Sequence, residues 1–349
     1  MRQPIAGDYA DFQKNHPLHR TCPGCYNLYM DKLNPIYGIH HITAIASNPQ
    51  RNLDFYTKTL GLRLVKRTIN FDDPGTYHFY FGDGQGTPGT ILTFFPWPGA
   101  RRGRKGVGQV AVVAFAVADG SLGYWQQRLK EQGFSTAEPF ERFDEEVLPV
   151  LDPDGLALDL VITPGSQQMP AWTGGGVPEK HAIRGFHSPT LMLEGFEQTA
   201  HLLTAIFGMH AVAEARTGCR VRYQAAGANA FYPGLSVDID CRPAERPGQM
   251  GAGVVHHIAM RVADDAAQLA WRESLIAEGF NVTPVMDRQY FHSIYFREPG
   301  GILFELATDP PGFSLDESPE SLGQTLKLPP WLETKRDVIE KALPELSIS

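Results

Sequence analysis

The stretch from Gly253 to Asp309 decides how the rest of the chain is interpreted. It opens with VVHHIAM (residues 254–260) and contains GGILFEL (residues 300–306) near its end. The first run is apolar apart from its two histidines, which predicts a largely buried strand. The second run leaves a Pro-Gly-Gly turn and predicts another strand, in which Glu305 is the single charged residue. Because an unpaired buried charge is very costly, we expect Glu305 to be paired with a histidine on a neighbouring strand or with a metal ion.

A second copy of the His-His-Ile pattern lies far upstream, in IHHITAI (residues 39–45). Two such strands and one strand glutamate supply two imidazoles and a carboxylate. This is the composition of the two-His-one-carboxylate facial triad, which leaves open positions on iron for substrate and oxygen. The alternative is that the histidines are hydrogen-bonded core residues, and for any single histidine that is the more common case. The recurrence of one motif at matching places of an internal repeat favours the metal site.

Composition argues against several classes of protein. The chain has 349 residues and a formal net charge of −8, and its length predicts two domains. The basic cluster at residues 101–105 is short and predicts a solvated loop, so we expect no nucleic-acid partner. No apolar run approaches the ~20 residues of a membrane span, and the first residues lack the apolar core of a secretory signal. Four cysteines in a chain of this length form no disulfide framework, so we expect a cytoplasmic protein with no membrane partner.

The first 33 residues differ from the rest of the chain because they are polar and show no periodicity. They contain HPLHRTCPGC (residues 16–25), in which Cys22 and Cys25 could form a zinc site or a redox pair. We favour a flexible leader over either site, because no strand–helix context surrounds the cysteines. A chain that begins at Met30 is therefore expected to fold and to keep its activity. Loss of metal or of solubility in that shortened chain would support the cysteine site instead.

The remaining sequence is predicted to contain four copies of one unit, each with a strand, a helix and further strands. These modules start at Ile39, Val110, Gly185 and Val254. Modules two and four share the helix pattern Trp-x-x-x-Leu-x-x-x-Gly-Phe, at residues 125–134 and 271–280. Modules one and three share a different helix ending, in YTKTLGL (residues 56–62) and LTAIFGM (residues 203–209). The chain therefore looks like a duplicated pair of modules.

These signals predict the following boundaries. A leader occupies residues 1–33, an N-terminal domain with modules one and two residues 34–166, a linker residues 167–181, a C-terminal domain with modules three and four residues 182–312, and a tail residues 313–349. Within module two, Asp119 is expected to cap the helix at its N-terminus and Gly133 to end it.

Several longer motifs resemble one enzyme family. They are GIHHITAI (38–45), NFDDPGTYH (70–78), GTILTFFPW (89–97), DRQYFHSIYFREPGG (287–301), the pair Phe304-Glu305, and LPPWLE (328–333). Together they resemble the vicinal oxygen chelate superfamily and, within it, the dioxygenases that cleave the rings of para-hydroquinones. The resemblance covers roughly residues 34–346. It implies an α+β fold in which four βαβββ modules in two domains are paired into cupped sheets.

The resemblance also implies which residues bind the metal. In this superfamily the ligands stand on the first and last strands of two facing modules. Only modules one and four together supply two histidines and a carboxylate, so His41, His257 and Glu305 are the expected ligands and the metal is expected to span both domains. The spacing alone does not decide which histidine of each pair is the ligand, because successive strand side chains point to opposite faces. Asp159 in module two is expected to be a structural carboxylate.

The same resemblance implies proton-handling roles for His40, His256, Arg288 and Tyr295. From the residues alone, Arg288 could instead form a salt bridge with the adjacent Asp287, and Tyr295 could be a packed strand aromatic. Candidate substrate contacts are one threonine on the face of His41 and several aromatic side chains, for which ordinary core packing is the alternative: Thr43, Phe94, Trp97, Tyr290 and Phe291.

The expected activity is that of an Fe(II)-dependent, extradiol-type dioxygenase that inserts O2 into a hydroquinone or catechol ring. Its expected partners are the aromatic diol and O2, while Mn(II) as the metal and association into homo-oligomers are left open. One rival is a non-redox enzyme of the same superfamily, such as a glyoxalase-like lyase or isomerase. The other rival is a resistance protein that binds a quinone or a drug without turnover. The identity of the metal discriminates between these functions.

Overall fold

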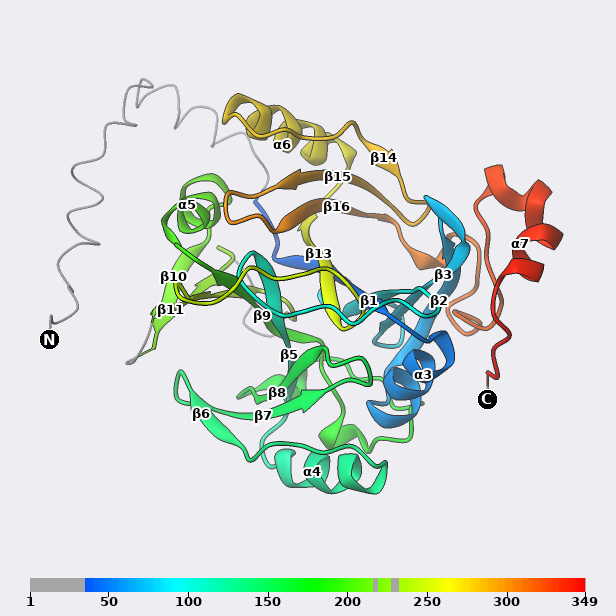
Figure 1. The fold of residues 1–349 in the computed structure, drawn as a ribbon, viewed down its shortest axis with the longest axis horizontal. Coiled ribbons are helices and arrows are strands. Elements are labelled where there is room, and N and C mark those ends of the chain that lie inside the picture. The colour runs from blue at the N-terminus through cyan, green and yellow to red at the C-terminus, as the bar shows by residue number, and fades with distance from the viewer. Residues whose placement is uncertain (1–34, 216–218, 227–231, 349) are drawn as a thin grey trace, which may run out of the picture. The chain divides into compact units, whose positions relative to one another are not determined.

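The computed structural model describes residues 35–215, 219–226 and 232–348, so the predictions for the leader, including Cys22 and Cys25, lie outside the described residues. From Pro35 onward the described residues belong to one compact unit. Two curled eight-stranded sheets form its framework (Figure 1). A few short helices connect some of the strands, which agrees with the expected α+β fold.

The first sheet carries the two histidine strands. Its order is β14 (Met286–Asp287), β15 (Phe291–Arg297), β16 (Leu303–Pro311), β13 (Val254–Val262), β1 (Ile39–Ala46), β4 (Ile91–Pro96), β3 (Asp73–Gly82) and β2 (Arg63–Asn70). Modules one and four therefore meet in one sheet, joined by the antiparallel pair of β1 and β13. This arrangement brings together the two modules that hold the expected ligands.

The second sheet is built from modules two and three in the same order. Its strands are β10 (His210–Glu214), β11 (Cys219–Gln224), β12 (Ser236–Cys241), β9 (Phe186–Leu193), β5 (Gln109–Val117), β8 (Ala157–Ile162), β7 (Glu145–Leu151) and β6 (Phe140–Arg142). Each predicted domain thus contributes strands to both sheets. The boundaries at residues 166 and 182 remain a prediction.

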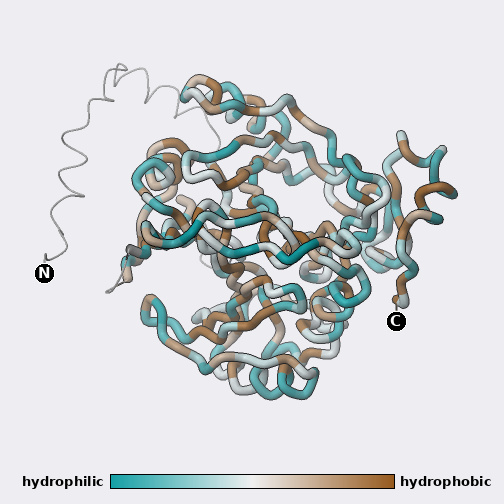
Figure 2. Tube along the Cα trace, viewed as in Figure 1, coloured by the Kyte–Doolittle hydropathy of each residue, from teal (hydrophilic) through white to brown (hydrophobic). Residues whose placement is uncertain are grey.

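Two equivalent helices confirm the repeat of modules two and four. Helix α4 (Leu122–Glu131) buries Trp125, and helix α6 (Asp265–Ala277) buries Trp271 in the corresponding place. After each helix the backbone turns at a glycine with positive φ, 82° at Gly133 and 90° at Gly279, as expected for a helix end. Figure 2 shows hydrophobic and hydrophilic residues alternating along both helices, so each buries one face against a sheet.

The predicted cap of α4 is wrong. The helix begins at Leu122, its N-cap position is Ser121, and no side chain caps it. In module four the equivalent Asp264 does cap α6, because its Oδ1 accepts from the Ala267 amide at 2.8 Å. The segment between β5 and α4, residues 118–121, is two residues longer than the segment between β13 and α6, residues 263–264, and it passes through Gly120 with φ of 74°. This left-handed turn moves Asp119 away from the capping position.

Modules one and three also share the end of their helix. Helix α3 (Pro49–Asp54) continues into a π-helical turn at Phe55–Thr59, and α5 (Glu197–His201) continues into one at Leu202–Ile206. The next glycine of each module, Gly61 and Gly208, has a φ of 71°. The different sequence endings of these modules therefore correspond to a different helix ending in the structure.

The C-terminal segment packs along β2, the edge strand of the first sheet. The Lys327 amide donates to the Arg67 carbonyl at 2.9 Å. Lys66, which is fully buried, donates to Asp316 at 2.6 Å and to Glu317 at 2.5 Å. These contacts cover an exposed strand edge. The last helix of this segment is α7 (Arg336–Ala342), and none of the helices described is long and apolar enough to cross a membrane.

Candidate metal centre

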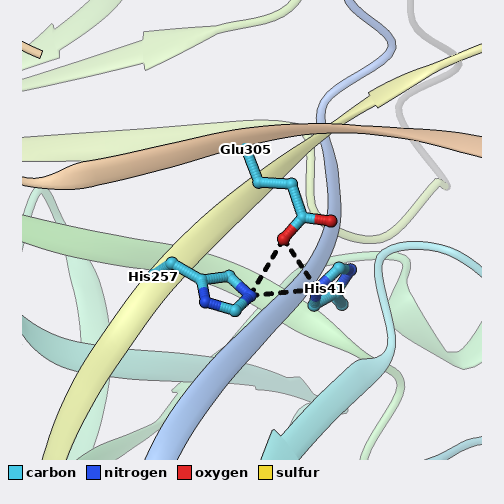
Figure 3. A group of neighbouring side chains, drawn as sticks. All are labelled: His41, His257 and Glu305. Carbon is cyan, nitrogen blue, oxygen red and sulfur yellow. Dashed lines mark hydrogen bonds and ion pairs between the residues drawn. The ribbon is translucent and has the colours of Figure 1, made fainter. Parts of the chain in front are cut away.

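Three side chains from three adjacent strands converge on one face of the first sheet, which we call the site face. His41 extends from β1, His257 from β13 and Glu305 from β16 (Figure 3). Their atoms form a small triangle, with 3.3 Å between the two Nε2 atoms, 3.4 Å from His41 Nε2 to Glu305 Oε2, and 3.0 Å from His257 Nε2 to the same oxygen. All three side chains are buried. Among the described residues this is the one His/Cys/Asp/Glu group that could hold a metal ion.

The triangle fits a transition-metal ion. Metal–nitrogen bonds of about 2.1 Å at roughly right angles place neighbouring ligand atoms about 3 Å apart. Without an ion, Glu305 Oε2 is buried with no hydrogen bond of normal geometry among the described residues. Such an orphaned carboxylate oxygen is very costly in a protein interior. Two imidazole nitrogens that face each other and one anionic oxygen are the donor set of a facial triad.

Electrostatics favour the protonation states that a metal requires. Burial lowers the pKa of His257, so this imidazole is neutral near pH 7. Burial alone would raise the pKa of Glu305, but His41 and His257 outweigh it and hold that pKa well below its usual value. The glutamate is therefore ionised and the histidine offers a lone pair, as metal ligation requires.

A β-bulge stands at the first histidine of each pair. The pairing of β1 with β13 shifts between Ile39 and His41, and again between Thr43 and Ala44, which leaves His40 and His256 as the extra residues. Bulges commonly re-aim side chains beside active sites. Here they bring His40 Nδ1 to 2.9 Å from His41 Nδ1, and His256 Nδ1 to 2.8 Å from His257 Nδ1. The expectation that each pair points to opposite faces is wrong for this reason.

These contacts orient the ligand rings. A histidine that binds a metal through Nε2 carries its proton on Nδ1 and usually donates it to an acceptor nearby. His40 and His256 provide that acceptor. Burial lowers the pKa of His40 well below its usual value and that of His256 to about 3, so both accept as neutral rings.

Ser293 orients the third ligand and was not among the predicted site residues. Its hydroxyl donates to Glu305 Oε1, which leaves Oε2 facing the two histidines. Ser293 lies on β15 between Phe291 and Tyr295, with one residue separating it from each. Alternate residues of a strand share a face, so the predicted positions of Phe291 and Tyr295 were a signal that could have identified Ser293.

Tyr295 lies beside His257, and Arg288 contacts Tyr295. The Tyr295 ring centroid is 5.8 Å from that of His257, and Arg288 Nε donates to the Tyr295 hydroxyl at 3.3 Å. Burial and the nearby Glu305 raise the pKa of Tyr295, so its hydroxyl keeps its proton. Arg288 Nη1 also contacts Asp72 at 3.0 Å, so its acidic partner is this distant residue and not the adjacent Asp287.

Three of the four aromatic residues predicted to contact substrate lie on the side of the site face, and each has different neighbours. Phe291 packs against His41 with ring centroids 4.9 Å apart, and therefore borders the triad directly. Trp97 donates through Nε1 to Asp73 at 2.7 Å. Tyr290 contacts the C-terminal segment and not the triad. Its hydroxyl donates to Asp316 at 3.0 Å, and Lys66 Nζ lies over its ring.

The fourth aromatic residue, Phe94, lies on the opposite face of the sheet. Its ring packs against Tyr56 of the α3 segment at 4.6 Å, in the core beneath the helix. Strand alternation explains this placement, because Phe95 points the other way and contacts Trp97 at 5.3 Å and His256 at 5.8 Å. Phe94 is therefore not on the site face, where the prediction placed it, and Phe95 is the aromatic residue of β4 on that face.

A series of hydrogen bonds begins at Thr43, which was predicted to contact substrate, and leads to Tyr80. Its hydroxyl lies 2.8 Å from that of Thr93, which lies 2.9 Å from His78 Nε2. His78 Nδ1 in turn lies 2.9 Å from the Tyr80 hydroxyl. His78 belongs to the motif NFDDPGTYH but was not singled out from the sequence. Its separation from Tyr80 by one strand residue is the signal that places both on the site face.

The second sheet carries no such triad at the equivalent positions. There Asp159, the counterpart of Glu305, is paired with Arg142 at 2.7 Å. Glu145 accepts from Arg222 at 2.8 Å and lies 3.0 Å from His187 Nε2. The carboxylates of this sheet are thus held by arginines, which agrees with the structural role expected of Asp159.

We predict that Asp159→Asn keeps the metal and weakens the fold. The substitution leaves Arg142 buried without its counter-charge, a change that costs up to about 3–5 kcal/mol. Thermal unfolding should show the loss of stability, and elemental analysis should show unchanged iron per chain. A fall in iron as large as that in His257→Ala would place a metal ligand in module two and contradict the assignment.

A family model matches most of the chain. It is the Glyoxalase/Bleomycin resistance protein/Dioxygenase superfamily, matched at residues 38–160 and 185–306. The chain belongs to this superfamily. The two matched ranges cover modules one and two and modules three and four, so the family match follows the internal duplication.

Relatives in the superfamily are named as ring-cleaving enzymes. The chain is 49% identical over 306 residues, which are 88% of this chain and 95% of the relative, to "Putative ring-cleaving dioxygenase MhqO" of Bacillus subtilis (strain 168). It is 37% identical over 316 residues, 88% of this chain and 96% of the relative, to "Chlorohydroquinone/hydroquinone 1,2-dioxygenase" of Sphingobium indicum. These relatives place the chain among the ring-cleaving dioxygenases of the superfamily.

Solved structures agree with the fold. A crystal structure of a "putative dioxygenase" from Bacillus subtilis subsp. subtilis has a TM-score of 0.85 at 47% identity, covering 90% of this chain and 99% of the other. The V278E mutant of glyoxalase I from Zea mays has a TM-score of 0.61 at 13% identity, covering 82% and 97%. At that identity the second similarity shows the fold alone.

Proposed function

We propose that the protein is an Fe(II)-dependent, extradiol-type dioxygenase that inserts O2 into the ring of a hydroquinone or catechol. The observation that carries the proposal is the triangle of His41, His257 and Glu305, a facial donor set with one negative charge. The names of the relatives support an aromatic ring as the substrate. When bound by the triad, iron supplies open positions for substrate and O2 and a route for electrons between them.

The protein's own residues bind and orient the reacting groups. Arg288 and the Tyr295 hydroxyl lie together beside His257, where a guanidinium stabilises negative charge on a substrate oxygen and a phenol donates a hydrogen bond to it. The tether from Arg288 to Asp72 holds the guanidinium in place across two modules. Phe291 packs against His41 and Phe95 against His256, and both provide apolar surface for a flat ring.

Proton handling is assigned to rings that stay neutral near pH 7. His40 and His256 accept from the rings of His41 and His257 through Nδ1, so each neutral ring carries its single proton on Nε2 and can donate it in a second hydrogen bond. They are therefore proposed to orient the two metal-binding histidines and to hold a proton at Nε2 that a bound oxygen can accept.

The rival glyoxalase-like activity uses Zn, Ni or Co and usually a fuller ligand set. In this chain Thr93 stands where a second carboxylate would be needed, and its hydroxyl is engaged by Thr43 and His78. Three ligands and one negative charge suit a metal that must bind both a diol and O2. The same set argues against a binding protein without turnover, which needs no intact triad.

The test is metal removal and replacement. The protein stripped by a chelator should consume no O2 with hydroquinone, and Fe(II) added without air should restore consumption at one iron per chain, because the triad binds one ion. Mn(II) and Zn(II) are the parallel additions, and an oxygen electrode gives the rate. Restoration by Zn(II), or an Fe(II)-loaded protein that fails to consume O2 with any hydroquinone or catechol, would contradict the proposal.

A further inference from the structure

The hydrogen-bond chain from Thr43 to Tyr80 ends inside an apolar cluster. The Tyr80 side chain is almost completely buried, and its ring packs against Phe313 at 5.1 Å and Tyr290 at 6.3 Å. Among the described residues its hydroxyl contacts His78 and no other polar group. Burial raises the pKa of Tyr80 well above its usual value, so the hydroxyl always carries a proton. That proton has one acceptor within reach, which is His78 Nδ1.

Because the Tyr80 hydroxyl has this single acceptor, the donor and the acceptor of every hydrogen bond in the series are determined. If His78 Nδ1 carried the proton and donated to Tyr80, the phenol proton would remain buried without a partner, which costs about 1–3 kcal/mol. Tyr80 therefore donates to Nδ1. A neutral imidazole then carries its single proton on Nε2 and donates it to Thr93, and burial keeps His78 neutral by lowering its pKa well below the usual value. Thr93 in turn donates its hydroxyl proton to Thr43.

The last hydroxyl in the chain stands beside the metal ligands. Thr43 pairs with His257 across β1 and β13 and with Thr93 across β1 and β4. Directly opposite residues on one face of a sheet have side chains about 5 Å apart, so the Thr43 hydroxyl borders the triad. It accepts from Thr93, and its own proton has no acceptor among the described residues. That proton remains for a ligand.

We propose that Tyr80, His78 and Thr93 are positioning residues that hold the Thr43 hydroxyl as a hydrogen-bond donor to an anionic ring oxygen of the substrate. This inference rests on the proposed function. It also deepens it, because the fixed direction leaves the Thr43 proton for a hydrogen bond to the substrate. An ionised diol oxygen, which accepts hydrogen bonds and donates none, suits such a donor.

The test compares two tyrosines of one strand in the full-length protein loaded with Fe(II). Tyr80→Phe removes the hydroxyl that fixes the chain, and kcat/KM for hydroquinone should fall roughly five- to tenfold, as expected for one hydrogen bond, at unchanged iron content. Tyr77→Phe is the matched control, because its hydroxyl donates to the Pro344 carbonyl away from the site. The control should match the wild type. A Tyr80→Phe enzyme with wild-type kcat/KM would overturn the proposal.

A double-substitution cycle separates positioning from general stability. Thr43→Val keeps the shape and removes the donor, so Tyr80→Phe should cause no further loss in that background. Equal losses in both backgrounds, or a loss of iron that parallels the loss of rate, would show that Tyr80 acts through the fold and would overturn the inference.

The tautomer of His78 tests the direction without measuring turnover. In protein loaded with Zn(II) as a diamagnetic substitute, nitrogen NMR should find the His78 proton on Nε2 in the wild type and a mixture of tautomers in Tyr80→Phe. A wild-type proton on Nδ1 would reverse the chain and refute the donor at Thr43. If hydroquinone gave no O2 uptake in the wild type, the proposed function would fail, whereas this spectrum would still decide the direction of the hydrogen bonds.

Discussion

His41→Ala is expected to abolish iron binding and ring cleavage while the fold survives. Weakening a hydrogen bond to a ligand already costs roughly 10- to 100-fold in metal affinity, so removing one of three ligands should cost more. Metal analysis of the purified variant should find iron near background, and O2 uptake with hydroquinone should fall by more than about 100-fold. The remaining pair, His257 and Glu305, keeps its contact at 3.0 Å but offers two donors in place of three.

The control for this substitution is another histidine of the same sheet. His292 on β15 is partly exposed and bonded to Asp265 at 2.6 Å, so His292→Ala should keep both iron and activity. Circular dichroism and thermal unfolding show whether either variant has lost its fold. A His41→Ala protein that still bound iron normally and cleaved hydroquinone would confine the metal to the second half of the chain. Glu305→Gln, which keeps shape and removes the charge, should weaken iron binding in the same way.

The triad could be predicted from the sequence because its signals are local and repeated. Each His-His pair sits in an apolar run, and the run recurs at a matching place of the repeat, so the two pairs stand out although His41 and His257 are 216 residues apart. The choice of the second histidine in each pair came from the family resemblance. Glu305 stands out because a charge inside an apolar strand requires a partner. The resemblance to the superfamily implied that modules one and four meet, and both belong to one sheet.

The surroundings of the triad were less predictable, because they depend on register. Strict alternation places the two histidines of a pair on opposite faces, whereas a bulge at His40 and another at His256 let their rings touch. A bulge is one extra residue in one strand, and it becomes visible only when the partner strand is known. The choice of Phe94 over Phe95 was avoidable, because Thr93 already marked the site face of this strand and alternation puts Phe95, two residues on, on the same face.

Partners that come from distant loops were beyond sequence reasoning. Asp287 is the nearest acid to Arg288 in sequence, but its carboxylate accepts from the Gln289 amide at 2.7 Å. The guanidinium instead reaches Asp72, in the turn between β2 and β3. The sheet places these strands of modules one and four around one face, a closeness that local sequence does not reveal.

Tyr295→Phe is expected to retain iron and to lose activity by about 10²-fold, the usual effect of removing a group that transfers a proton or stabilises charge. The Tyr295 hydroxyl lies 3.3 Å from Arg288 Nε, and within the described part of the chain no hydrogen bond joins it to His41, His257 or Glu305, so metal affinity should be unchanged. The matched control is Tyr124→Phe, because that hydroxyl accepts from Arg128 on α4 of the second sheet's module.

Arg288→Lys distinguishes a role in chemistry from a role in packing. A lysine keeps the positive charge but cannot hold both the Tyr295 hydroxyl and Asp72 with a planar fork. If Arg288 positions Tyr295 for reaction, the lysine variant should lower kcat, and adding Tyr295→Phe should lower it little further. Steady-state O2 uptake in all four proteins, at equal iron content, gives this comparison. Full turnover in Tyr295→Phe would instead return Tyr295 to the ordinary packing of β15, and additive losses would mean that the arginine and the tyrosine act on different steps.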